Sequence, residues 1–324
     1  MTNPIAQAKA NARTTITTVT LNAAIDKTYY VPAFDKGKVS RVGKVVATAG
    51  GKGLNVARVL KQLGHAEVAA TGFAGGYNGR FITSRVREAG IRAEFIDIPG
   101  ESRLCLNLID GRDGSSTELL EPGPDIGAEA LERFKRRLRQ LSAESALVVF
   151  SGSLPGGVAP ELYAELIALS RAAGADVFLD SSGEALVRGV SALPSFIKPN
   201  EDEIVSLLPE PRHADLREGI RKLMHRGIPV VAATLGAEGA VAGAGGRLYR
   251  VRLPKLETVN TVGSGDSFVA GYAFGHVRGW PVEACLRHAA AAGSANALSA
   301  TTGDVDPAVH RRLLGEISVE EWPG

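Results

Sequence analysis

The chain has 324 residues, of which 44% are hydrophobic and 22% charged, so its composition is that of an ordinary folded protein with enough residues for a large core. The formal net charge of +2 gives no support for a nucleic-acid or acidic-membrane partner. No apolar run reaches the ~20 residues of a membrane span, and the two cysteines, Cys105 and Cys285, lie in apolar contexts typical of buried thiols rather than of a disulfide, a nucleophile or a zinc site.

The first residues are predicted to form a mobile tail, residues 1–14, because Met1 to Arg13 is polar and alanine-rich and lacks the apolar core of a signal peptide. The cytoplasm is therefore the expected location. The remainder, residues 15–324, is long enough for one large domain with an appendage or for two domains.

Strand and helix patterns follow one another along the chain. Thr15–Leu21 is β-branched and apolar, which predicts a buried strand followed by a polar segment that ends at Asp26. A polar residue just past such a strand faces the ligand crevice of an α/β sheet, so Asp26 is a candidate binding residue, with a simple turn residue as the alternative. Gly50–Gly53 opens a predicted helix whose apolar face is Val56, Val59, Leu60 and Leu63.

The remaining elements are predicted from the same patterns. Before residue 126 we expect a strand at 67–73, a helix at 80–89 and a strand at 93–98. After it we expect helices at 127–141, 160–173, 184–189, 201–208, 214–226, 265–278 and 282–299, and strands at 146–150, 176–180, 196–197, 230–234, about 239–243 and 248–252. This alternation predicts an α/β fold with a mainly parallel sheet that helices cover on both faces.

Two parts of the chain depart from this alternation. Residues 29–48 have the pattern of two short strands with a turn, and residues 103–109 and 116–121 have the pattern of a hairpin around an Asp/Gly turn. Together these segments, ~27–48 and ~102–122, are expected to form a small sheet outside the main one.

The segment with the strongest chemical signal is Asn260–Gly271. Its Gly263, Ser264 and Gly265 form a tight turn that ends on Asp266 and feeds a run of small, apolar residues. A glycine turn at a helix N-terminus leaves backbone N–H groups free to bind an anion. We expect Asp266 to accept the proton of a hydroxyl that attacks a phosphoryl group held by this turn; the alternative is a plain loop with Asp266 as a helix cap.

Other nucleotide and hydrolase motifs do not fit. The segment Gly51-Lys52-Gly53 lacks the hydroxyl that completes a P-loop, and residues 72–79 do not match Gly-x-Gly-x-x-Gly. Residues 151–156 are not the Gly-x-Ser-x-Gly of a hydrolase. A P-loop NTPase, a NAD enzyme and a serine hydrolase are therefore disfavoured.

Two further stretches, Ala49-Gly-Gly-Lys-Gly-Leu-Asn55 and Lys198-Pro-Asn-Glu-Asp-Glu203, precede the glycine turn. In this order the three stretches resemble the ribokinase-like phosphofructokinase-B family of sugar kinases, over about Thr15 to the end of the chain. The resemblance implies a three-layer α/β/α sandwich with a mainly parallel sheet and a small β-sheet lid, in one kinase domain of residues 15–324. It also implies that ATP and Mg²⁺ are required.

The resemblance assigns roles to individual residues. It implies sugar binding by Asp26, Gly50, Gly51, Lys52, Asn55 and Ser153, and binding of the acceptor's own phosphate by Lys38 and Arg103. On the nucleotide side it implies Lys198, Asn200, Thr234, Gly236, Glu238, Gly239 and Val262. Asn200 and Glu203 match an Asn-x-x-Glu motif that organises Mg²⁺ through water. A helix cap at Asn200 is a competing role, and both roles can hold at once.

The implied activity is that of an ATP-dependent hexose-phosphate kinase, with a phosphofructokinase acting on fructose 1-phosphate or fructose 6-phosphate as the main hypothesis. Some 6-phosphofructokinases of the family carry arginine where Glu118 aligns, and the segment around Glu118 resembles tagatose-6-phosphate kinases, which are the alternative. A kinase of an unphosphorylated sugar or nucleoside, or a non-catalytic nucleotide-binding regulator, are weaker alternatives. The small sheet, with Leu104, Leu106 and Leu108 on one face, is expected to be both a lid and a homodimer interface.

Overall fold

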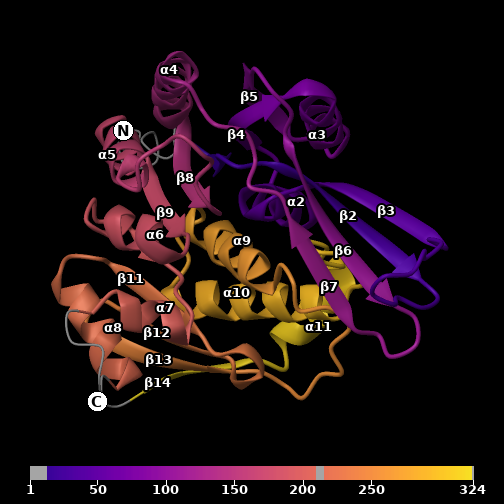
Figure 1. Ribbon diagram of the computed structural model, residues 1–324. Helices are drawn as coiled ribbons and strands as arrows, with labels where there is room; N and C mark the ends of the chain where they lie inside the picture. Colours follow the sequence, from indigo (N-terminus) through magenta and orange to yellow (C-terminus); the bar gives the residue numbers. More distant parts are fainter. Residues whose placement is uncertain (1–12, 209–214, 323–324) are drawn as a thin grey trace.

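The computed structural model describes residues 13–208 and 215–322 (Figure 1). Its centre is a sheet with the strand order β14-β13-β12-β11-β10-β9-β8-β1-β4-β5. The strands are β1 (Thr15–Thr20), β4 (Val68–Gly75), β5 (Arg92–Ile98), β8 (Ser145–Ser151), β9 (Asp176–Asp180), β10 (Phe196–Ile197), β11 (Val230–Thr234), β12 (Ala240–Ala244), β13 (Arg247–Arg252) and β14 (Ser318–Glu321). Pairing is parallel from β5 to β11 and antiparallel from β11 to β14.

Helices cover both faces of this sheet. One face carries α2 (Lys52–Gln62), α3 (Gly76–Glu88), α9 (Ser264–His276), α10 (Val282–Ala297) and α11 (Pro307–Leu314), and the other carries α4 (Ala128–Glu144), α5 (Leu162–Ala172), α6 (Gly183–Val190), α7 (Glu201–Ser206) and α8 (Leu216–His225). Successive strand residues point to opposite faces. In β9, for example, Phe178 lies in one core, whereas Val177 and Leu179 lie in the other. The predicted three-layer α/β/α architecture is confirmed.

A second, four-stranded sheet has the order β3-β2-β6-β7. It consists of β2 (Ala24–Val31), β3 (Lys44–Gly50), β6 (Arg103–Asp110) and β7 (Ser116–Leu120). Figure 1 shows it projecting to one side of the large sheet. The predicted small separate sheet is thus confirmed. Asp26, expected just past the first strand, lies inside β2 of this sheet.

Two elements near the C-terminus were not predicted. Helix α11 begins after Asp306, whose side chain accepts hydrogen bonds from the backbone of Ala308 and Val309, with Pro307 in its first turn. β14 then pairs with the edge strand β13. The predicted tail lies outside the described residues except for Arg13 and Thr14, and in the described ranges no helix is long and apolar enough to cross a membrane.

Candidate active site

Helix α9 begins at a glycine with a left-handed backbone. Gly263 has φ 82°, and a side chain there would come within 2.7 Å of Thr302 Cγ2 and 2.9 Å of the Gly303 backbone nitrogen. Only glycine meets both demands. The next glycine, Gly265, lies beside Lys198: an added Cβ would be 3.1 Å from its Nζ. The predicted turn is therefore present, and it combines the free amides of a helix N-terminus with a lysine ammonium.

Asp266 lies in the first turn of α9 and is only 5% exposed. Asn55, on α2, donates a hydrogen bond from Nδ2 to its Oδ2 at 2.8 Å. Burial, followed by the charge of Asp180, raises the pKa of Asp266 to about 6, against the opposing effects of Lys52, Asn55 and Lys198. A carboxylate with a pKa in this range can accept a proton near neutral pH.

Asp180, at the end of β9, is a site residue for which sequence patterns predicted no role. It is 1% exposed, and neither of its carboxylate oxygens has a hydrogen-bond partner among the described residues. Its Oδ1 lies 3.4 Å from Lys198 Nζ and 3.8 Å from Lys52 Nζ, and its charge is the main reason that the pKa of Lys52 is raised. One buried carboxylate thus holds two cations beside the glycine turn. The signal that could have revealed it is an acid at the carboxyl end of a parallel strand.

A cavity of about 480 Å³ separates the turn from the small sheet. Of the predicted residues, it is lined by Asp26, Gly51, Lys52, Asn55, Arg103, Ser153, Val262, Gly263, Gly265 and Asp266. Gly50 contributes indirectly, because a side chain there would overlap the carboxylate of Asp26. The structure therefore brings most of the residues predicted for sugar binding and catalysis into one cavity.

Asp26 lines this cavity, and the charge of Arg58, which lies outside the lining, acts on it. Burial raises the pKa of Asp26, whereas Arg58, Arg103 and a hydrogen bond from the Gly51 amide act to lower it. Arg58, which the sequence did not single out, donates to Asn55 Oδ1, at 3.2 Å, and to the carbonyls of Ala49, Thr302 and Gly303. Arg58 thus connects the base of the small sheet to the residue that holds Asp266.

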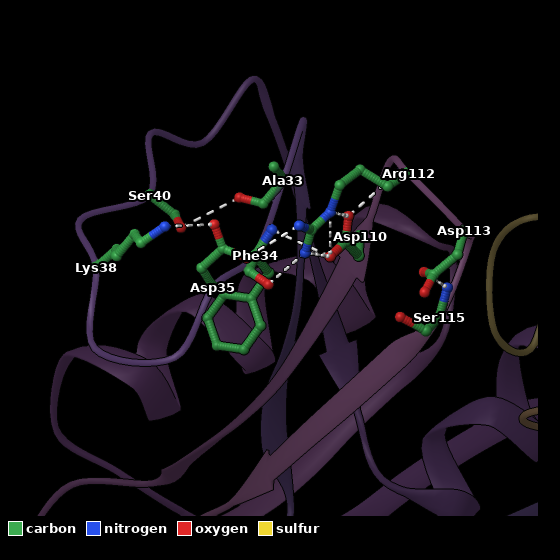
Figure 2. Close-up of polar contacts among 9 residues, drawn as sticks. All are labelled: Ala33, Phe34, Asp35, Lys38, Ser40, Asp110, Arg112, Asp113 and Ser115. Atoms are coloured by element: carbon green, nitrogen blue, oxygen red, sulfur yellow. Dashed lines mark hydrogen bonds and ion pairs between the residues drawn. The ribbon is translucent and has the colours of Figure 1, made fainter.

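The two cations predicted for the acceptor's phosphate lie in different places. Arg103 lines the cavity and is held by hydrogen bonds to the carbonyls of Asn22, at 3.2 Å, and Glu121, at 3.1 Å. Lys38 lies in the loop between β2 and β3, where its side chain is 74% exposed and its Nζ is 3.4 Å from Asp35 Oδ2. Figure 2 shows the same Asp35 paired with Arg112, at the outer end of the small sheet. In this chain Lys38 is outside the cavity that Arg103 lines.

The face of the small sheet that borders the cavity carries acidic, amide, thiol and apolar side chains. Strand pairing aligns Asp26 with Cys105 and Leu120 in one row, and Asn107 with Glu118 in the next. All five line the cavity. Burial raises the pKa of Cys105 to about 11, which excludes a reactive thiolate at neutral pH. Glu118 leaves an acidic group facing the space where an acceptor would bind.

A second cavity, of about 580 Å³, opens on the other side of the turn. Of the predicted nucleotide residues, Thr234, Gly236 and Gly239 line it, and Ser264 and Gly265 close one end. Glu238 is not in the lining: its side chain is 81% exposed and faces Arg250. Lys198 lies beside the turn, and Val262 lines the first cavity instead. The apolar walls come from residues that sequence patterns did not mark: Leu253, Pro254, Leu256, Phe268, Ala290 and Ala297.

The predicted metal residues form a helix cap. Glu203 N–H donates to Asn200 Oδ1 at 2.8 Å, and Asn200 N–H donates to Glu203 Oε2 at 2.9 Å, a reciprocal arrangement at the start of α7. Among the described residues, no group of three or more His, Cys, Asp or Glu side chains could hold a metal. Mg²⁺ usually keeps several of its waters, and the two oxygens of Asp180, which have no hydrogen-bond partner among the described residues, are acidic groups beside the turn that such a hydrated ion would face.

Known proteins are similar to this chain over most of its length. Residues 19–308 match the model of the pfkB family carbohydrate kinases. The chain is 37% identical over 311 residues to a tagatose-6-phosphate kinase from Staphylococcus epidermidis, an alignment that covers 94% of this chain and 99% of the relative.

Solved structures are similar over almost the whole chain. Phosphofructokinase-2 from Escherichia coli, in complex with substrates and products, superposes with a TM-score of 0.87 at 26% identity, covering 93% of this chain and 98% of the other. Its tetrameric inhibited form gives a TM-score of 0.87 at 25% identity, with the same coverage. The fold, the glycine turn before Asp266 and the family match together show that the chain belongs to the pfkB family of carbohydrate kinases.

Proposed function

We propose that the chain transfers the γ-phosphoryl group of ATP to a hydroxyl of a phosphorylated ketohexose. The observation that carries this proposal is the place of Asp266: it is a buried base at the start of a helix whose turn residue Gly265 lines both cavities. A phosphoryl donor can enter from one side of such a turn and an acceptor from the other. In this proposal, residues 15–324 form one kinase domain, and the small sheet is inserted into it as a lid.

Phosphoryl transfer needs the phosphates held, their charge neutralised and the nucleophile aligned. In this proposal the amides at the start of α9 bind the transferred group, and Lys52 and Lys198 neutralise it. A bound Mg²⁺, held through water by Asp180 and Glu203, would add charge neutralisation. Because a sugar hydroxyl is a far weaker acid than a carboxylic acid, Asp266 orients the hydroxyl and takes its proton late, as the new P–O bond forms.

The acceptor's own phosphate is assigned to Arg103, the guanidinium of the first cavity. A guanidinium held by two backbone carbonyls is ready for a charge-assisted contact with phosphate. Glu118 would repel a phosphate placed at the outer row of the lid, so the phosphate is expected at the Arg103 end. Fructose 1-phosphate and fructose 6-phosphate are the main candidates. Tagatose 6-phosphate is the second candidate, because Glu118 stands where some 6-phosphofructokinases carry arginine.

The test is an ADP-release assay over fructose 1-phosphate, fructose 6-phosphate, tagatose 6-phosphate, unphosphorylated fructose and a nucleoside. One phosphosugar should exceed free fructose in kcat/KM by about 10- to 100-fold, the value of one charge-assisted contact. Preference for free fructose or the nucleoside would contradict the phosphate site. ATP binding without ADP release from any acceptor would instead favour a non-catalytic regulator.

We also propose that the small sheet pairs with a second copy of the chain. Leu104, Leu106 and Leu108 alternate along β6 with Arg103, Cys105 and Asn107, so their side chains point to the opposite face, although Leu106 also contributes to the cavity lining. On that same face Val45 is 52% exposed and Leu119 is 54% exposed. A four-stranded sheet with an open apolar face gains stability by pairing, and a two-fold dimer is the commonest solution.

Light scattering tests this pairing. Wild type should have twice the chain mass at micromolar concentration, and Leu119→Lys, a change on this face outside the cavity lining, should give a monomer that loses catalysis more than ATP binding. The matched control is Val187→Lys, which adds a lysine at a 40%-exposed position on α6 and should stay dimeric. A fully active wild-type monomer would end the proposal.

A further inference from the structure

Arg58 is a charged residue in the middle of a buried helix. The residues on either side of it along α2 are fully buried: Val56, Ala57, Val59 and Leu60. Burial is the main effect on the pKa of Arg58 itself, which it lowers. A guanidinium that leaves water costs free energy unless hydrogen bonds replace the lost solvent. The acceptors that surround Arg58 therefore indicate what its side chain does.

The guanidinium joins three segments of the chain. Its Nη2 donates to the carbonyl of Ala49, near the end of β3 in the small sheet. Its Nη1 donates to the carbonyls of Thr302, at 3.0 Å, and Gly303, at 3.4 Å, in the segment after α10. Nη1 also donates to Asn55 Oδ1, at 3.2 Å, about one turn earlier on α2. A rigid guanidinium fork holds acceptors in fixed directions, whereas a lysine ammonium is a compact charge with rotatable donors.

Gly303 fits closely against this junction. Its φ is 64°, and an added Cβ would come within 2.9 Å of both Arg58 Nη1 and Asn55 Oδ1. Only glycine has the required backbone and leaves this room. The adjacent Thr302 packs against Gly263, the residue that opens the glycine turn. Arg58 is thus held between Asn55 and the backbone that borders this turn.

The hydrogen bond from Arg58 determines which way the Asn55 amide faces. A guanidinium can only donate, so it pairs with the oxygen of the amide. The amide nitrogen is then the group that faces Asp266, and it donates to Oδ2 at 2.8 Å. Among the described residues, Arg58 makes the one hydrogen bond to Asn55 Oδ1. Without it, the amide could turn over and place its oxygen against the carboxylate, where two acceptors repel each other.

We propose that Arg58 is a positioning residue: it holds the Asn55 amide in the direction that presents a donor to Asp266, and so sets the orientation of this base. The inference rests on the proposed function in that Asp266 receives the acceptor's proton. Arg58 does not line the acceptor cavity. It therefore acts through Asn55 and not on the substrate.

The charges around Asp266 give the sign of the expected pH effect. Asp180, at the end of β9, raises the pKa of Asp266, whereas Lys52 of α2 and Lys198, beside the turn, lower it. The hydrogen bond from Asn55 also lowers it, because it favours the ionised carboxylate. Loss of this hydrogen bond should therefore raise the pKa of Asp266 above its wild-type value of about 6.

The charges around Arg58 show why this residue needs a direct measurement. Its guanidinium is faced by Asp26 of β2, by Asp304 after α10 and by Asp266. The charge of Arg58 lowers the pKa of Asp26, so its removal acts on two carboxylates of the site. A kinetic pH profile combines both effects, whereas titration of Asp266 itself separates them.

The first test is Arg58→Met, which keeps the length of the side chain and removes its donors. Its kcat should fall about 10- to 100-fold, because the base is no longer held in place, while KM for ATP stays within twofold. Arg58→Lys restores the charge but not the fork, and should also lose most of kcat. If Arg58→Met does not fold, Arg58→Lys is the variant that decides.

Gln62→Met is the matched control. Gln62 lies on the same helix and anchors the same segment after α10. It donates to Asp304 Oδ1 at 2.8 Å and accepts from the Val305 amide at 2.9 Å, and its side chain makes no hydrogen bond to Asn55. If anchoring this segment were the whole role of Arg58, Gln62→Met would reproduce the loss. We expect its kcat to stay within twofold of wild type.

The second test titrates Asp266 by ¹³C NMR of carboxyl-labelled aspartate in the protein without ligands, and Asp266→Asn identifies its resonance. The midpoint should lie about one pH unit higher in Arg58→Met than in wild type, and unchanged in Gln62→Met. Asn55→Ala should show the same rise, and adding Arg58→Met to it should change little more. If no acceptor is phosphorylated but this midpoint still shifts, the proposed function fails and the orienting role of Arg58 stands.

Three results would overturn the inference. A midpoint for Asp266 that is the same in wild type and in the Arg58 variants would show that Arg58 does not act on the base. Wild-type kcat in Arg58→Lys would show that a nearby charge suffices without the hydrogen bond to Asn55. An equal loss of kcat and an equal shift in Gln62→Met would assign the effect to the segment after α10.

Discussion

Asp266→Asn is expected to lower kcat by about 10²–10⁴-fold, because the variant loses the group that orients the acceptor hydroxyl and takes its proton. Asparagine keeps the shape of the side chain and can still contact Asn55, so ATP binding should persist. The fold should also persist, since at neutral pH the variant removes a carboxylate whose ionised form burial disfavours. Steady-state kinetics with calorimetric ATP binding measure both effects. A variant that keeps most of its turnover would remove Asp266 from the chemistry.

The same residue predicts the pH dependence of wild type. Asp266 acts as a base only when unprotonated, and its pKa is raised to about 6. Activity should therefore be level above this pH and fall about tenfold per pH unit below it. Without the raised pKa, the fall would come near the ordinary aspartate value of about 3.9. A kcat/KM profile that stays level to pH 4.5 would contradict the buried environment of Asp266.

Arg103→Ala is expected to raise KM for the phosphosugar about 10- to 100-fold and to leave KM for ATP nearly unchanged. The variant removes the guanidinium that lines the acceptor cavity, and one charge-assisted contact is worth about 1.5–3 kcal/mol. The effect should vanish with an unphosphorylated acceptor. Arg80→Ala, which removes an exposed arginine near the start of α3, is the matched control.

The same assay tests Lys38, which is predicted to bind the phosphate but lies outside the cavity of its own chain. An equal rise in KM for Lys38→Ala would support its predicted role, and an unchanged KM would remove it from the site. If Arg103→Ala raised KM for ATP instead, the assignment of the two cavities would be reversed.

Local sequence patterns predicted the central strands well. Phe196–Ile197 and Val230–Thr234 have the bounds expected from their short apolar runs. Helix α11 and strand β14 were not predicted, for different reasons. Helix α11 had a usable signal in Asp306-Pro307, a cap followed by proline at the first helical position. β14 has only one apolar residue, Val319, and is a strand because it pairs with an edge, which no periodicity predicts.

Some residues of the site could likewise be predicted from local sequence, and others could not. The glycine turn and Asp266 are contiguous in sequence, so their geometry follows from local rules. Asp180 becomes a site residue only through the strand order, which brings the end of β9 to the two lysines beside the same turn. Lys38 is the opposite case, because the sequence predicts a phosphate-binding cation there, but the conformation of its loop directs the side chain away from the cavity.

ATP and a phosphosugar are expected to react across the turn before Asp266. The most direct measurement is ³¹P NMR of wild type and Asp266→Asn with Mg²⁺, ATP and the best acceptor of the panel. With wild type, ADP and a sugar bisphosphate should appear in equal amounts, and with the variant the bisphosphate should form at least about 100-fold more slowly. ADP accumulating with inorganic phosphate and no bisphosphate, or a bisphosphate formed equally fast by the variant, would contradict the account.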